Sequence, residues 1–305
     1  MGIAWVFPGQ GSQKVGMAAG VIELPQAQQR FNLASELLGR DLLAICEGTA
    51  GAATASEEST DGPSDLNDTR NTQPALFVIE SLLVDELKAR SGTPSLVAGH
   101  SLGELVALYA AGVFDVDTGL KLMKIRSELM AAAGGGAMTA VMGFDREELD
   151  ALVAATEGVV VANDNSSAQV VLSGSPEAVA SVSGQLKCKR AIPLAVSGAF
   201  HSPFMAEAAA AFGEVLESVA FADAEIPVLS NTDPRPEIAG AALKQRLRNQ
   251  MTSGVRWRET MEAFSGHGIT SALEIGPGNV LSGLIKRSCE GLSTGQIGSA
   301  ADLTP

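Results

Sequence analysis

The order of predicted strands and helices constrains the fold of this 305-residue chain more than any other feature. Short apolar segments with strand character alternate with segments of helical periodicity, which is the pattern of α/β proteins. The pattern predicts strands at 3–7, 95–98, 226–229 and 271–275. It predicts helices at 26–46, 74–90, 117–133, 203–219, 239–250, 256–264 and 280–287, and a further helix that follows the second strand and ends near 111.

Three consecutive glycines at 134–136 interrupt this pattern and predict a hinge into a second unit. Strands are predicted there at 138–142, 159–162, 169–172 and 191–196, with helices at 145–155 and 176–186. The order βαββαβ is typical of a ferredoxin-like domain. We therefore expect a discontinuous large α/β domain, residues 1–133 and 199–305, with a small domain, residues 134–198, inserted into it.

Composition limits the location and the partners of the chain. Hydrophobic residues make up 46% but aromatic residues only 4%, so a sizeable core must be mainly aliphatic. No apolar run reaches the roughly 20 residues of a membrane helix, and no signal peptide is evident, so we expect a cytoplasmic protein. The net charge of −14 argues against binding to nucleic acid or to anionic membranes. Residues 48–68, rich in small residues and acids, are predicted to form a mobile loop.

Cysteine and histidine are too few and too scattered to predict a metal site. Cys46, Cys188 and Cys289 are far apart and show no CxxC spacing, so they are interpreted as reduced packing residues. The three histidines do not have ligand spacing either. We expect no bound metal.

The segment 99–103, GHSLG, matches the G-x-S-x-G pattern of a nucleophilic serine. An apolar strand precedes it and an apolar helix follows it, as a strand-to-helix turn requires. The glycines let the strand and helix approach closely, and the helix N-terminus can stabilise a developing oxyanion. Ser101 is therefore the candidate nucleophile, with a simple helix-capping serine as the alternative.

A neutral serine hydroxyl needs a base, and only three histidines are available. His100 adjoins Ser101 on a sharp turn, so its ring is expected to point elsewhere and to support the turn. His267 follows a helix, where it can interact with the helix C-terminus. His201 lies where the inserted unit returns to the large domain, and junction loops beside clefts often carry catalytic groups. His201 is the preferred base, with a structural histidine as the alternative.

Arg126 lies on the apolar side of the predicted helix 117–133. A buried guanidinium needs an anionic or carbonyl partner, which an internal salt bridge could supply. Alternatively, Arg126 could receive a substrate carboxylate in a bidentate fork. Beside a nucleophilic serine, an acyl substrate that carries a carboxylate is the simpler interpretation.

Several motifs together resemble the malonyl-CoA:acyl carrier protein transacylases, from about residue 3 to residue 287. They are FPGQGSQ at 7–13, TQPA at 72–75, GHSLGE at 99–104, Arg126, AFHS at 199–202, NQ at 249–250 and EIGPG at 274–278. The resemblance implies an α/β-hydrolase-like core with an inserted ferredoxin-like small domain. The loop 48–68 departs from the family by being longer, and the tail after residue 290 is poorly defined by the pattern.

The resemblance also implies a set of catalytic roles. Ser101 would be acylated and His201 would be the general base, oriented by the backbone carbonyl of Gln250 instead of an aspartate. The backbone N–H groups of Gln10 and Leu102 would form the oxyanion hole.

The same resemblance places substrate-binding residues around the serine. Arg126 would hold the malonyl carboxylate, with Met130 one helical turn further and Gln73 near the pocket. Asn163 lies in a stretch similar to one that borders the family's cleft, although it could simply form a turn. Phe200 could crowd a methyl branch on the malonyl group, or could simply pack; in related polyketide acyltransferases a phenylalanine before this histidine accompanies malonyl.

The implied activity is ping-pong transfer of malonyl from malonyl-CoA to the phosphopantetheine thiol of acyl carrier protein, for fatty-acid synthesis. Both thioesters are substrates, so no cofactor is expected, and we expect a monomer. A polyketide acyltransferase would use the same motifs. A serine esterase would leave Arg126 without a purpose, and a silent binding module would leave Ser101 and His201 unused.

An acidic carrier protein would need a basic patch, for which the candidates are Lys187, Lys189, Arg190, Lys286 and Arg287.

Overall fold

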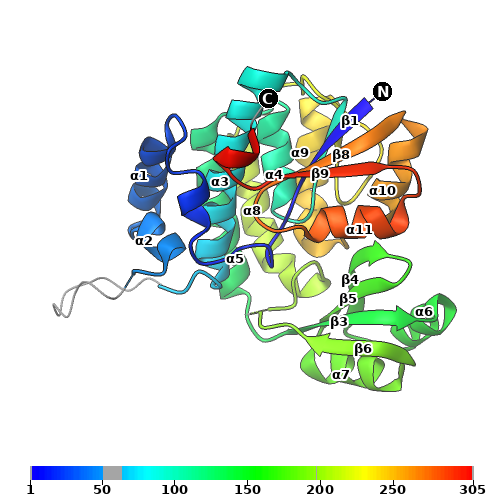
Figure 1. Cartoon of the computed structure of the whole chain (residues 1–305). Coiled ribbons are helices and arrows are strands. Elements are labelled where there is room, and N and C mark those ends of the chain that lie inside the picture. Colours follow the sequence, from blue (N-terminus) through cyan, green and yellow to red (C-terminus); the bar gives the residue numbers. More distant parts are fainter. Residues whose placement is uncertain (1, 51–63, 197, 304–305) are drawn as a thin grey trace, which may run out of the picture.

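The computed structural model describes residues 2–50, 64–196 and 198–303, so most of the predicted loop 48–68 lies outside the described residues. The chain forms an α/β structure with one parallel and one antiparallel sheet (Figure 1). The parallel sheet has the order β7-β2-β1-β8-β9. Its strands are β1 (Gly2–Phe7), β2 (Leu96–Gly99), β7 (Val228–Leu229), β8 (Ile269–Ile275) and β9 (Ser293–Ile297).

Helices cover both faces of the parallel sheet, and the alternation of side chains along β1 shows why. Trp5 and Phe7 face a core that includes residues of α3 (Thr69–Ser91), α4 (Gly103–Ala110), α5 (Val116–Ala132), α8 (Ala206–Ser218) and α9 (Gly240–Asn249). Ala4 and Val6 face a second core formed with α10 (Trp257–Gly266) and α11 (Val280–Ser288). Successive strand residues point to opposite faces, so an unbroken apolar strand is buried on both sides.

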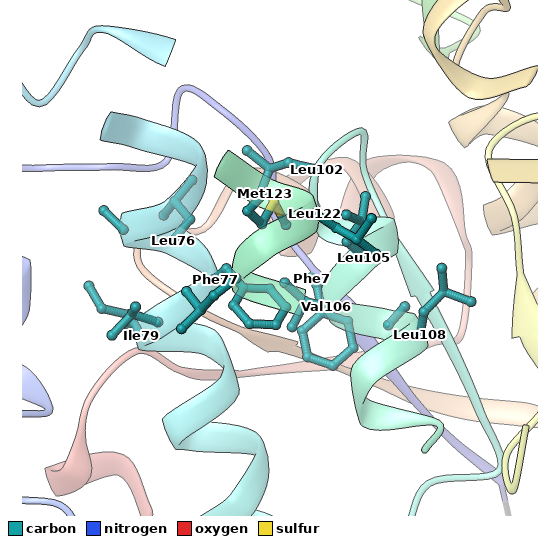
Figure 2. Packing of buried hydrophobic residues seen from close by; sticks show 14 of the residues in the cluster. Phe7, Leu76, Phe77, Ile79, Leu102, Leu105, Val106, Leu108, Leu122 and Met123 are labelled. Atoms are coloured by element: carbon teal, nitrogen blue, oxygen red, sulfur yellow. The ribbon is translucent and has the colours of Figure 1, made fainter. Parts of the chain in front are cut away.

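The larger core lies where α3, α4 and α5 meet the sheet. Figure 2 shows side chains of these elements packed together, among them Phe7, Phe77, Leu105, Val106 and Met123. The ring of Phe77 also fills the space beside Gly119, where a Cβ would lie 2.1 Å from it. This packing fixes α5, the helix that carries Arg126, against α3 and α4.

Four predictions for the large unit were wrong in detail. The single helix predicted at 26–46 is two helices, α1 (Ala27–Leu38) and α2 (Leu42–Glu47). Gly39 ends α1 with a φ of 68°, and the Asp41 side chain caps α2. Helix α3 begins at Thr69 instead of residue 74, strand β7 spans only two residues, and the tail after residue 290 contributes strand β9.

The antiparallel sheet has the order β4-β5-β3-β6. It contains β3 (Ala137–Phe144), β4 (Val159–Ser166), β5 (Gln169–Gly174) and β6 (Cys188–Pro193), with helices α6 (Arg146–Ala155) and α7 (Pro176–Gln185). These six elements occur in the predicted order βαββαβ. They enclose a core of their own, which includes Val141, Leu149, Val170, Leu172 and Val182.

Strand β4 connects this sheet to the rest of the structure. Val255 donates its backbone N–H to Ala162 at 2.7 Å and accepts from Asp164 at 2.9 Å.

Short 3₁₀ turns complete the described structure: η1 (Met17–Gly20), η2 (Pro203–Met205), η3 (Gln250–Thr252) and η4 (Ala300–Leu303). The three cysteines are free. Of the helices described here, none is both long and apolar enough to cross a membrane.

Candidate active site

Ser101 lies on a tight turn between the end of β2 and the start of α4. Its φ is 54°, in the left-handed region that a residue with a Cβ occupies only under constraint. The glycines beside it are needed for close approach. A Cβ on Gly99 would lie 1.9 Å from the carbonyl of Gly103, and a Cβ on Gly103 would lie 2.2 Å from the carbonyl oxygen of Phe7. The turn therefore has the geometry that the G-x-S-x-G spacing predicts.

His201 lies against Ser101, although one hundred residues separate them in the sequence. The distance from Ser101 Oγ to His201 Nε2 is 2.7 Å, and the distance from His201 Nδ1 to the backbone oxygen of Gln250 is 3.0 Å. A carbonyl oxygen can only accept, so Nδ1 carries the proton and Nε2 has the lone pair that faces the serine hydroxyl. His201, like Ser101, has a positive φ, 56°.

Burial keeps the His201 ring neutral. The side chain is 3% exposed, and this burial, followed by the nearby charge of Arg126, lowers the pKa of His201 to about 3. At neutral pH the ring can therefore accept a proton. The imidazolium that forms would need a negative partner, which an oxyanion on an attacked carbonyl supplies.

Arg126 is fully buried beside the same serine. Its Nη1 donates to Gln73 Oε1 at 2.6 Å, and its Nη2 donates to Gln250 Oε1 at 2.8 Å and to Ser101 Oγ at 3.3 Å. Its Nε makes no hydrogen bond, and no salt bridge joins Arg126 to a carboxylate within the described ranges. Burial lowers the pKa of Arg126 to about 10, against an opposing effect of Glu104. A buried cation with a free donor is suited to an incoming carboxylate.

A chain of hydrogen bonds leads from Arg126 to the loop after β1. Gln73 directs its Oε1 at Arg126 because its Nε2 donates to Thr69 Oγ1 at 2.9 Å and to Met130 Sδ at 3.4 Å. Thr69 in turn donates to Gln10 Oε1 at 2.9 Å. The structure therefore brings three of the predicted residues, Gln73, Met130 and Gln10, into one network with Arg126.

The loop that carries Gln10 packs directly on the Ser101 turn. A Cβ on Gly9 would lie 2.6 Å from the carbonyl oxygen of His100, so glycine allows this approach. Within the described chain, the backbone N–H groups of Gln10 and Leu102 donate no hydrogen bond. Both donors are thus without an acceptor in the described residues, as the predicted oxyanion hole requires.

Sequence reasoning missed two buried residues behind the serine, Glu104 and Asn231. Asn231 accepts from the Ser101 N–H at 2.8 Å and donates to the Gly99 carbonyl at 2.5 Å. Glu104 Oε2 accepts from the Asn231 N–H at 3.0 Å and from Gln250 Nε2 at 2.8 Å. Glu104 ends the GHSLGE motif and is a lone acid in an apolar helix, but neither feature indicated its role, and no local pattern marked Asn231.

The other two histidines have different surroundings. His100 Nε2 lies 2.8 Å from Asn165 Oδ1, and its ring packs edge-on against Trp257. Because Asn165 belongs to β4, this contact joins the serine turn to the antiparallel sheet. His267 is exposed just after α10.

Two further candidates, one buried and one half-buried, make no polar contact within the described residues that defines a role. Phe200 is 6% exposed and directly precedes His201. Asn163 is half-buried in β4, and its Oδ1 has no hydrogen-bond partner in the described chain. All five candidates for a basic patch are exposed.

The fold and the geometry of the site are similar to those of α/β enzymes that use a nucleophilic serine and a neutral histidine. The chain belongs to the acyl transferase domain family, whose model matches residues 4–300.

Individual relatives are similar over their whole length. The malonyl CoA-acyl carrier protein transacylase of Synechocystis sp. is 47% identical, and the match covers 99% of each chain. A crystal structure of the Synechocystis sp. enzyme superimposes with a TM-score of 0.92 at 48% identity, again over 99% of each chain. A malonyl-transacylase in complex with its type II polyketide synthase acyl-carrier protein gives a TM-score of 0.89 at 37% identity, over 99% of this chain and 98% of that one.

Proposed function

We propose that this enzyme transfers malonyl groups from malonyl-CoA to the phosphopantetheine thiol of an acyl carrier protein. The observation that carries the proposal is Arg126, a buried guanidinium 3.3 Å from Ser101 Oγ with an unpaired Nε. An acyl group held there must offer a negative charge within a few bonds of its thioester carbonyl, and malonyl does. The names of the relatives agree with this substrate.

In the first half-reaction, Ser101 Oγ attacks the thioester carbonyl while His201 Nε2 takes the hydroxyl proton. The backbone N–H groups of Gln10 and Leu102 hold the oxyanion, and Arg126 holds the carboxylate. The tetrahedral intermediate then collapses, the C–S bond breaks, and the coenzyme A thiolate takes the proton back from His201. The result is a malonyl-serine ester, free coenzyme A and a neutral histidine.

In the second half-reaction, the carrier thiol repeats these steps in reverse. His201 removes the thiol proton, the sulfur attacks the ester carbonyl, and Ser101 leaves with the proton from His201. One thioester is consumed and one is formed, so the exchange is close to thermoneutral. Neither step needs a cofactor or a metal.

The contact at His201 Nδ1 argues against an esterase. An esterase of this type would be expected to orient its histidine with a carboxylate. Here Nδ1 faces the backbone oxygen of Gln250 at 3.0 Å. An esterase would also have no use for Arg126. The similarity to a transacylase bound to its polyketide carrier protein leaves fatty-acid and polyketide carriers as the two alternatives for the acceptor.

The proposal also assigns a domain fold to each of the two parts of the chain. Residues 1–133 and 199–305 would form an α/β-hydrolase-like large domain, with residues 134–198 as a ferredoxin-like small domain. The antiparallel strand order β4-β5-β3-β6 supports the second assignment, because it places the first and third strands of the unit at the centre. The separate apolar core of this unit supports the boundary.

The experiment compares holo and apo forms of one acyl carrier protein as acceptors of malonyl from malonyl-CoA. The apo form, which lacks the thiol, is the matched control. We expect malonyl-carrier to form with the holo form only, and to revert when excess coenzyme A is added. Release of free malonate with no transfer to the holo form would contradict the proposal and favour a hydrolase.

A further inference from the structure

The buried carboxylate that lies nearest to balancing the charge of Arg126 does not contact it directly. Its hydrogen-bond acceptors are the neutral oxygens of Gln73, Gln250 and Ser101. Behind Gln250 lies Glu104, a fully buried carboxylate in the first turn of α4. The Gln250 amide thus stands between the two charges, donating to Glu104 Oε2 at 2.8 Å and accepting from Arg126 Nη2 at 2.8 Å.

The direction of that amide is fixed by its neighbours. A carboxylate can only accept, and so can the Ser101 carbonyl, which lies 2.9 Å from Gln250 Nε2. The NH₂ group must therefore face Glu104 and Ser101, and the amide oxygen must face Arg126. Each hydrogen bond in this buried chain polarises the next, so the negative charge of Glu104 reaches Arg126 through the amide.

We propose that Glu104 is the resident counter-charge of Arg126 and that, acting through Gln250, it sets how tightly the acyl carboxylate is held. The inference rests on the proposed function, in which Arg126 receives that carboxylate. Glu104 touches neither substrate nor reacting atoms, so it is a positioning residue.

The placement of the Gln250 amide between Glu104 and Arg126 has a physical reason. A carboxylate in direct contact with Arg126 would occupy the position that the substrate carboxylate needs. A guanidinium with no counter-charge would be costly to bury, and it would retain the acyl carboxylate through both half-reactions. A counter-charge behind one amide leaves the Nε of Arg126 open while it weakens the attraction for the substrate.

The electrostatics of the two side chains support this coupling. Burial raises the pKa of Glu104, while hydrogen bonds from Asn231 and Gln250, the Ser230 hydroxyl and the charge of Arg126 oppose that rise. Glu104 in turn opposes the lowering of the Arg126 pKa by burial. Two donors aimed at one carboxylate oxygen favour its ionised form.

Glu104→Gln separates the charge from the hydrogen bonds. The Asn231 N–H needs an acceptor, so the new amide oxygen is expected to take the place of Oε2 and to keep the contact with Gln250. The amide nitrogen would replace Oε1, which makes no hydrogen bond in the described structure. The variant thus removes the counter-charge while the local geometry is retained.

The measurement is calorimetric binding of malonate at pH 7.5, with the KM values for malonyl-CoA and acetyl-CoA as a second readout. We expect Glu104→Gln to bind malonate about three- to tenfold more tightly than wild type, in the lower part of the range of coupling between neighbours in one network. The same variant should show a lower KM for malonyl-CoA, whereas the KM for acetyl-CoA, whose acyl group carries no carboxylate, should not fall. A purely structural role would weaken malonate binding, so the sign of the change decides.

The matched control is Glu128→Gln, which removes an exposed negative charge from the same helix as Arg126. Its malonate affinity should equal that of wild type. Gln250→Met, which removes the amide between the two charges, should also tighten malonate binding, and it provides a second test if Glu104→Gln does not fold.

Arg126→Ala separates this inference from the proposed function. If Arg126→Ala leaves malonate affinity unchanged, the role of Arg126 in the proposed function fails. If Arg126→Ala abolishes malonate binding but Glu104→Gln leaves it unchanged or weaker, only the inference about Glu104 fails.

Discussion

Gln250 contacts Arg126 with its side chain and His201 with its backbone. Its Oε1 accepts from Arg126 Nη2 at 2.8 Å, and its carbonyl oxygen accepts from His201 Nδ1 at 3.0 Å. One residue at the end of α9 therefore orients both the base and the group that would hold the acyl carboxylate. A shift of Gln250 would therefore change the hydrogen bonds of both Arg126 and His201.

The first prediction concerns the pH dependence of acylation. Burial and the charge of Arg126 lower the pKa of His201 to about 3, so the free enzyme should keep its base neutral throughout the physiological range. kcat/KM for malonyl-CoA reports on the free enzyme. On its acid limb it should stay flat to about pH 4 and fall only towards pH 3. A midpoint near pH 6.5, the ordinary value for histidine, would contradict this.

The lowered pKa of His201 also makes the folded protein less stable at low pH. The pKa of His201 is lower in the folded than in the unfolded protein, so acid favours the unfolded state. This contribution to stability is complete above about pH 6.5 and is lost as the pH falls towards 3. The stability of wild type relative to His201→Gln should therefore decline over that window.

The second prediction concerns selectivity for the acyl group. Arg126→Ala removes the proposed partner of the malonyl carboxylate, and breaking a buried pair costs about 3–5 kcal/mol. kcat/KM for malonyl-CoA should fall by roughly 10² to 10³ or more, while acetyl-CoA should lose much less. Arg126→Lys keeps the charge but not the bidentate guanidinium, so its kcat/KM for malonyl-CoA should lie between those of wild type and Arg126→Ala. An unchanged malonyl-to-acetyl ratio would show that the arginine is structural.

The third prediction concerns a methyl branch on the substrate. Phe200→Ser should create space beside His201, and methylmalonyl-CoA should gain about tenfold in kcat/KM relative to malonyl-CoA. Phe204→Ser is the matched control, because Phe204 is 45% exposed. Equal effects of both substitutions, or none, would leave Phe200 with a packing role alone.

The fourth prediction concerns the acyl carrier protein. Lys286 and Arg287 are exposed near the end of α11, and they line a surface hollow with Gln169 of the antiparallel sheet. Charge reversal at Lys286 should raise the KM for an acidic carrier protein without changing that for malonyl-CoA. Lys121→Glu, on the outer side of α5, serves as the control. A parallel rise for both substrates would argue against docking at this patch.

Local patterns in the sequence predicted the elements better than the network behind them. The order βαββαβ followed from hydrophobic periodicity and turn residues, because both act over a few neighbouring positions. The two helices at 27–47 were predicted as one, although Gly39 and Asp41 are ordinary end and cap residues. Strand β9 was missed because it is only partly buried at the edge of the sheet, so its hydrophobic pattern is weak.

The site residues also divide into those that a local sequence pattern marks and those that only the fold brings together. Ser101 and Arg126 could be selected because their residue types interrupt the local pattern, and His201 because it is one of only three histidines and lies in a junction loop. The links from Ser101 to Asn231 and from Glu104 to Gln250 span more than one hundred residues. Such contacts depend on how the parallel strands bring their carboxyl ends together, which no local spacing encodes.

The central claim is that Ser101 carries the acyl group, and intact-protein mass spectrometry with malonyl-CoA alone tests it most directly. Wild type should gain one malonyl group, located on Ser101 by peptide mapping. Ser101→Ala should gain none, and His201→Ala should gain it at least about 10²-fold more slowly. A stable malonyl adduct on another residue, or no adduct when the reaction is quenched before turnover, would contradict the account.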